Sequence, residues 1–155
     1  EAKRLGVTVM WDPAPATAGF PLESFDALDV VTPNQTEAEA LTGIAVTDLR
    51  SARTAADALH GMGAPTAVVK LGEGGVYYSG PDGNGHVASH DVDIVDSVAA
   101  GDAFGGAFAV TLGEGRGIET AVRAGAAAGA LAVTRPGAQE AMPPRDEVLR
   151  MMSRG

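Results

Sequence analysis

The sequence lacks cysteine and contains few aromatic residues. Without a cysteine among its 155 residues, the chain has no disulfide framework, no thiolate nucleophile and no cysteine-ligated zinc, a composition compatible with a reducing compartment. Because there are only one Trp, two Tyr and four Phe, small aliphatic side chains and glycine must fill much of the core. We therefore expect a cytoplasmic protein with a closely packed core of small residues.

Positive charge and long apolar runs are also scarce. The 11 Lys and Arg residues are outnumbered by 20 Asp and Glu, which gives a formal net charge of -9. Since no basic cluster is present, nucleic acid and anionic membrane surfaces are poor candidates for partners. No apolar run reaches about 18 residues and no secretory-signal pattern is found, so no membrane-spanning segment is expected. An anionic ligand would have to be held by backbone amides or by a metal ion.

Short apolar runs alternate with helical patterns along the chain. Buried strands are predicted at Val7–Asp12, Val30–Asn34 and Ala67–Leu71. The turn pairs within Pro81–Gly85 predict an antiparallel hairpin between Val76–Ser79 and His86–Val95. Helices are predicted between Asn34 and Gly43, and over Asp48–Met62, Ala99–Leu112, Ile118–Thr134 and Arg145–Met152. This order indicates an α/β layered domain with a mainly parallel sheet.

Ligands of such sheets bind beyond the carboxyl ends of the strands. Asp12-Pro13, Asn34, Gly72–Gly75 and Asp96–Asp102 are predicted to lie there. In the last of these segments, a strand is expected to end at Asp96, and a turn of small residues opens a helix with Asp102 in its first turn. Free amides and the helix dipole at such a start form an anion site. Asp102 could take a proton from an attacking hydroxyl there, or be only a favourable first-turn carboxylate.

Five segments, in order, resemble motifs of the ribokinase-like (PfkB) sugar kinases. DSVAAGDAFGGAFA resembles the D-T-x-x-[A/G]-G-D signature of that family. The others are MWDPAPA, similar to N-P-A-P-A; VTPNQTEAEALTG, similar to T-P-N-x-x-E; VVKLGEGGVYYS, similar to [T/K]-L-G-x-x-G; and LAVTRPGAQEAMP, similar to A-V-T-R-x-G-A. The resemblance runs from about residue 1 to residue 150. It implies a three-layer α/β/α ribokinase-like fold, of which residues 1–155 form the C-terminal nucleotide-binding and catalytic portion, without the N-terminal sugar-binding half and lid.

The resemblance also implies an activity and its residues. It implies that ATP phosphorylates a small sugar in the presence of Mg²⁺, with Asp102 as general base and the amides of Ala99, Ala100 and Gly101 as an anion hole. The full-length enzyme would be a homodimer. The nucleotide site would comprise Asn34, Glu37, Lys70, Gly72 and Gly75. Glu37 would hold Mg²⁺ through water, a mode that suits a cation reluctant to dehydrate.

Some residues have a second interpretation. Asn34 and Glu37 fit the capping box of the following helix, and the glycines after Lys70 fit a tight turn. By resemblance, the Ala- and Gly-rich stretch 121–133 lines the adenine pocket, and by composition it packs closely against the sheet. The resemblance also implies a monovalent cation such as K⁺, which would be held by Asp96, Val98, Ala132, Arg135 and Gly137. The alternative to an active kinase is a catalytically incompetent, truncated nucleotide-binding module.

Overall fold

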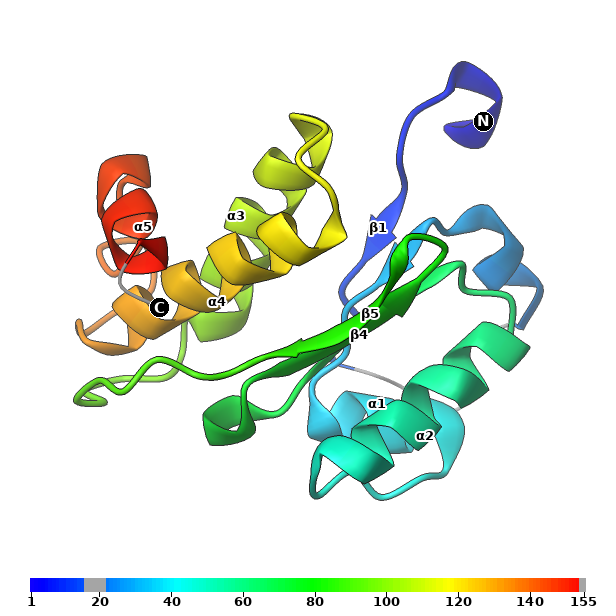
Figure 1. Ribbon diagram of the computed structural model, residues 1–155, viewed down its shortest axis with the longest axis horizontal. Coiled ribbons are helices and arrows are strands. Elements are labelled where there is room, and N and C mark those ends of the chain that lie inside the picture. Colours follow the sequence, from blue (N-terminus) through cyan, green and yellow to red (C-terminus); the bar gives the residue numbers. More distant parts are fainter. Residues whose placement is uncertain (16–21, 154–155) are drawn as a thin grey trace. The chain divides into compact units, whose positions relative to one another are not determined.

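Five strands form one mixed sheet in the computed structural model, which describes residues 1–15 and 22–153 (Figure 1). The strands lie in sequence order: β1 (Met10–Trp11), β2 (Val30–Val31), β3 (Thr66–Lys70), β4 (Val76–Gly80) and β5 (Gly83–Val87). The first three run parallel, and β4 is antiparallel to β3. The chain divides into two compact units, Glu1–His86 and Val87–Gly155.

In the first unit, α1 (Gln35–Thr42) and α2 (Leu49–Gly61) pack against strands of the sheet (Figure 1). Small residues on α2 make a close approach to the strands possible. Ala52, Ala55, Ala56 and Leu59 share a buried cluster with Val31, Ala67 and Val69 of the sheet. Trp11 packs edge-on against Phe25, with ring centroids 5.8 Å apart. Short 3-10 helices cover Lys3–Leu5, Leu22–Ala27 and Gly72–Gly74.

The second unit consists mainly of three helices: α3 (Ala100–Gly113), α4 (Ile118–Val133) and α5 (Arg145–Met152). α3 and α4 lie side by side, and α5 packs against α4 (Figure 1). A Cβ added at Gly125 of α4 would lie 2.8 Å from the ring of Phe104 on α3. The small residues of α4 thus serve helix–helix packing. No helix in the described ranges is both long and apolar enough to cross a membrane.

The predicted hairpin is present as β4 and β5, but its second strand is Gly83–Val87, so the bounds predicted for it, His86–Val95, are wrong. The hairpin turn is only Pro81-Asp82, β5 ends at Val87, and no strand follows in the described part of the second unit. Asp91 and Asp93 are exposed, and Ile94 is 61% exposed, so the alternating pattern has no buried face here. The N–H groups of Val95 and Asp96 donate instead to the carbonyl oxygen of Val133 in α4. Asp96 therefore does not end a strand, as the sequence had suggested.

The first two strands are shorter than predicted, with two residues each. Before β1, the N–H of Val9 donates to the Asp29 carboxylate at 2.7 Å. A side-chain oxygen there takes the place of a backbone acceptor from a neighbouring strand. After β2, Pro33 has no N–H to donate, which interrupts the ladder. Pairing resumes in an isolated parallel bridge between Asn34 and Lys70. The predicted helices agree with the observed ones to within about two residues, the usual uncertainty of helix ends.

Candidate functional site

In the first unit, the carboxyl ends of β1, β2 and β3 bring three polar residues to one edge of the sheet. Asp12 follows β1, Asn34 follows β2, and Lys70 ends β3. The N–H of Lys70 donates to the carbonyl oxygen of Pro33 at 2.9 Å, beside the bridge to Asn34. Asn34 and Lys70, predicted separately from two motifs, therefore lie on adjacent strand ends, where ligands of such sheets bind.

Asn34 and Glu37 form the predicted capping box at the start of α1. The Glu37 N–H donates to Asn34 Oδ1 at 2.9 Å, and the Asn34 N–H donates to Glu37 Oε2 at 2.7 Å. Glu37 is only 8% exposed. Each carboxylate oxygen has two lone pairs, so the cap leaves acceptor capacity on Glu37. Amide and carboxylate oxygens are hard ligands, and this pair fits Mg²⁺ held through water.

Lys70 forms an ion pair with Asp12 that spans the width of β2. Its Nζ lies 3.1 Å from Oδ1 and 3.0 Å from Oδ2 of Asp12. The side chains are 14% and 27% exposed, respectively. Sequence reasoning placed Asp12 at a strand end but did not assign it to the site. The available signal was that Asp12 occupies the place of the Asn in N-P-A-P-A while Lys70 occupies a place where Thr is common.

The glycines after β3 form a tight turn. The N–H of Gly75 donates to Gly72 O at 3.0 Å, and the N–H of Leu71 donates to Gly75 O at 2.8 Å. Gly72 and Gly75 both have positive φ, 58° and 84°, which residues with a Cβ rarely adopt. The interpretation as a turn is confirmed, and contact of these glycines with a nucleotide stays a prediction.

In the second unit, the start of α3 carries the other predicted residues. Ala99, the N-cap residue, is buried, and Asp102 is exposed in the first turn of this 14-residue helix. The N–H of Ala100 donates to Ser97 O at 3.3 Å, a long bond, while the helix offers no acceptor to the amides of its first turn. The dipole of α3 favours negative charge at this end. The site is therefore suited to an anion next to a carboxylate.

Asp96 joins the segment before α3 to the loop after α4. Its Oδ1 accepts from the Val98 N–H and its Oδ2 from the Gly137 N–H, both at 3.0 Å. These two hydrogen bonds lower the pKa of the Asp96 carboxyl from its usual value. Three of the residues predicted around a monovalent cation are thus brought together.

The other two residues of that set lie at the end of α4. The Ala132 carbonyl oxygen accepts from the Arg135 N–H at 3.2 Å, and the Arg135 guanidinium pairs with Glu147. The carboxylate and carbonyl oxygens of this region are the donor type that suits a hard cation, and the residues fit K⁺ in this respect.

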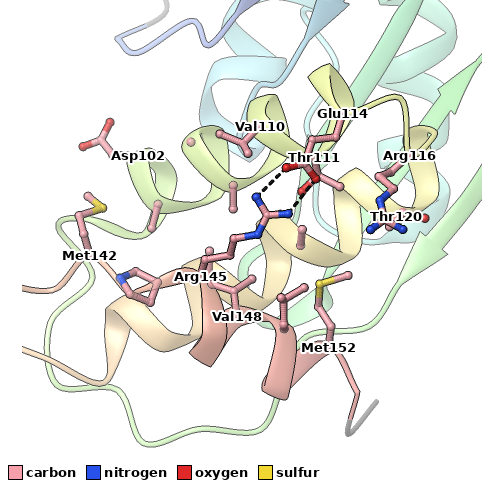
Figure 2. A pocket seen from close by; sticks show the side chains of 17 residues that line it. Asp102, Val110, Thr111, Glu114, Arg116, Thr120, Met142, Arg145, Val148 and Met152 are labelled. Carbon is pink, nitrogen blue, oxygen red and sulfur yellow. Dashed lines mark hydrogen bonds and ion pairs between the residues drawn. The ribbon is translucent and has the colours of Figure 1, made fainter.

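A pocket of about 400 Å³ lies among α3, α4 and α5, with Asp102 at its margin (Figure 2). Most of its lining is apolar, including Val110, Val148 and Met152. Arg145 of α5 crosses it and donates to both carboxylate oxygens of Glu114, at 2.6 and 2.9 Å. Sequence reasoning missed this pocket, although the helical spacing of Val148 and Met152 marks an apolar face.

Comparisons with known proteins identify the family and the solved structures that this chain resembles. The pfkB family of carbohydrate kinases matches residues 2–145. Ribokinase from Haemophilus influenzae is 40% identical over 97% of this chain and 49% of its own length. The crystal structure of ribokinase from Thermotoga maritima is 42% identical with a TM-score of 0.86, over 98% of this chain and 51% of that one.

A structure of Arabidopsis thaliana ribokinase, described as complexed with ribose and ATP, has a TM-score of 0.85 and 33% identity, over 97% of this chain and 49% of that one. The chain thus spans about half the length of the relatives it matches. The predicted ribokinase-like α/β fold is confirmed by these similarities. Because the family match covers nearly the whole chain, the protein belongs to the pfkB family of carbohydrate kinases.

Proposed function

We propose that the complete gene product phosphorylates a sugar hydroxyl with ATP. The observation that carries this proposal is the start of α3, where an exposed carboxylate stands in the first turn of a long helix. Family membership supports a carbohydrate as acceptor, and the Arabidopsis structure with ribose and ATP supports this pair of ligands. Since the chain spans about half the length of its relatives, the activity is proposed for the whole protein.

The second unit would supply the chemistry. Asp102 takes the proton of the sugar hydroxyl, whose oxygen forms a bond to the γ-phosphorus as the bond to the ADP oxygen breaks. The amides of Ala99, Ala100 and Gly101, with the helix dipole, stabilise the charge on the transferred phosphoryl group. The catalytic arrangement therefore needs a helix that starts at this turn, and Asp96 holds that turn to the loop containing Gly137.

The first unit would bind the nucleotide. Lys70 lies at the strand end as a cation for phosphate, and the turn between Gly72 and Gly75 lets a ligand approach its backbone closely. Asn34 and Glu37 would hold Mg²⁺ through water. The ion, when bound, neutralises charge on the phosphates. In the second unit, a K⁺ ion near Asp96 would add positive charge beside the anion hole.

Two measurements on the complete gene product test the proposal. Calorimetry with Mg·ATP measures nucleotide binding, and a coupled ADP assay over ribose, deoxyribose, fructose and nucleosides measures transfer. We expect micromolar to millimolar binding, in the usual range of KM values, and ADP release that depends on one sugar. Binding without sugar-dependent ADP release would favour the incompetent nucleotide-binding module. Absence of binding would refute both functions.

The proposed enzyme is a cytoplasmic homodimer. A dimer is the commonest symmetric assembly of soluble proteins. Light scattering of the complete gene product is expected to give twice the mass of one chain at micromolar concentration. A monomer mass at all concentrations tested would contradict the homodimer and leave the kinase activity unaffected.

A further inference from the structure

The ion pair of Asp12 and Lys70 lies at the edge of the sheet where the nucleotide is proposed to bind. We propose that Asp12 is a positioning residue, which holds the ammonium group of Lys70 in place for the phosphate groups of the nucleotide. This inference rests on the proposed function and deepens it, because it assigns a role to a residue outside the nucleotide set. Asp12 would act through Lys70 and would not touch the phosphates.

The geometry fixes Lys70 at both ends of its side chain. Its backbone is held by the hydrogen bond to Pro33 O and by the bridge to Asn34. Its Nζ lies within 3.1 Å of both oxygens of Asp12. A free lysine side chain has rotamer entropy to lose when it binds a ligand, and this loss is a cost that opposes binding. With the ammonium already held, phosphate binding avoids much of that cost.

The effect of each charge of the pair on phosphate binding also depends on the other charge. The Asp12 carboxylate would repel a polyphosphate if it stood alone, and Lys70 compensates it. Both side chains are largely buried, at 14% and 27% exposure. Removal of one partner then leaves the charge of the other partner with little solvent around it. This costs more free energy than removal of both partners. The effect of Asp12→Asn on phosphate binding must therefore change when Lys70 is absent.

A double-mutant cycle tests this dependence. Kd values for Mg·ATP and for inorganic tripolyphosphate are measured by calorimetry on the complete gene product, with Asp12→Asn, Lys70→Thr and both changes. We expect Asp12→Asn to weaken tripolyphosphate binding about fivefold and Lys70→Thr about tenfold, in the range of coupled neighbours. With Lys70→Thr already present, Asp12→Asn should strengthen binding, because it removes an uncompensated carboxylate. Equal losses in both backgrounds, or no loss with Lys70 present, would overturn the inference.

A matched control comes from the other unit. Glu114→Gln also removes a partly exposed carboxylate that accepts two hydrogen bonds from one cation. We expect Glu114→Gln to leave the Kd for tripolyphosphate unchanged. A loss equal to that of Asp12→Asn would show a general electrostatic or folding effect and refute a local role. Adenosine, which has no phosphate, should bind all variants alike, whereas a structural role of Asp12 would weaken adenosine as well.

Misfolding of a variant does not prevent the test. If Asp12→Asn fails to fold, Asp12→Glu keeps the charge and displaces it by one methylene group. We expect Asp12→Glu to weaken tripolyphosphate binding while adenosine binding is retained, and unchanged tripolyphosphate binding would overturn the inference. If the wild-type protein binds no Mg·ATP, the proposed function fails and the inference with it. If the wild type binds and Asp12→Asn binds equally well, only the inference fails.

Discussion

At the scale of single residues, Asp102 carries the proposed chemistry. We predict that Asp102→Asn in the complete gene product lowers kcat about 10²–10⁴-fold, the contribution of a general base. Asparagine has nearly the same shape but cannot take the proton. The Kd for Mg·ATP should change little, because asparagine leaves the backbone amides at the start of α3 in place. A coupled ADP assay at saturating sugar and ATP measures kcat, and an unchanged value would remove Asp102 from the mechanism.

Glu37 has two roles that one substitution can separate. Glutamine at the same position retains an oxygen for the capping box, which accepts Glu or Gln. We therefore predict that Glu37→Gln leaves the free energy of unfolding nearly unchanged but weakens Mg·ATP binding, since the charge near Mg²⁺ is lost. Urea unfolding and calorimetry measure the two effects.

The comparison variant is Asn34→Ala, which removes the N-cap side chain. Loss of this N-cap side chain is expected to lower the free energy of unfolding by about 0.5–2 kcal/mol. If Glu37→Gln destabilises the protein as much as Asn34→Ala and binds Mg·ATP as the wild type does, Glu37 has only the structural role.

At the scale of elements, the contact of α3 with α4 depends on a glycine. We predict that Gly125→Ala lowers the free energy of unfolding by about 1–3 kcal/mol, the cost of overpacking. The new methyl group would stand 2.8 Å from the Phe104 ring. Gly106 of α3 is the matched control, because nothing lies within 4 Å of an added Cβ there. Gly106→Ala should be neutral or slightly stabilising, since alanine favours helices. Equal destabilisation by both changes would contradict this account of the packing.

Asp96 links two segments through hydrogen bonds to its charged form, and this link depends on pH. Its pKa is lowered in the folded state. The stabilisation is therefore present above the unfolded pKa of about 3.9 and is lost as the pH falls through the folded pKa. We predict that Asp96→Asn lowers the free energy of unfolding at pH 7 and that the difference from the wild type shrinks below about pH 4. Urea unfolding across this range measures it, and a difference independent of pH would be contrary to the prediction.

The elements also show which local signals in a sequence are enough to predict a helix or a strand. The helix after Asn34 was predictable because its capping box and terminal glycine lie within a few residues of one another. The strand predicted near Asp91 was wrong because alternation alone does not specify a partner strand. For the same reason, the ion pair of Asp12 with Lys70, 58 residues apart, needed the sheet order before it could be recognised. Motif similarity located Asn34 and Lys70, whereas the residue that orients Lys70 came only from the geometry.

At the scale of the whole molecule, the net charge of -9 restricts how an anion can bind. The overall field repels polyanions, so affinity for ATP must come from local groups such as Lys70, the α3 start and Mg²⁺. A ligand that binds only the folded state raises the free energy of unfolding by about 2.7 kcal/mol at 100 times its Kd. We predict such a logarithmic increase with Mg·ATP in thermal or urea unfolding, a smaller increase with ATP and EDTA, and none with double-stranded DNA. Because DNA offers more phosphate but no fit to these groups, stabilisation by DNA comparable to that by Mg·ATP would mean that nonspecific charge, and not the local site, binds the nucleotide.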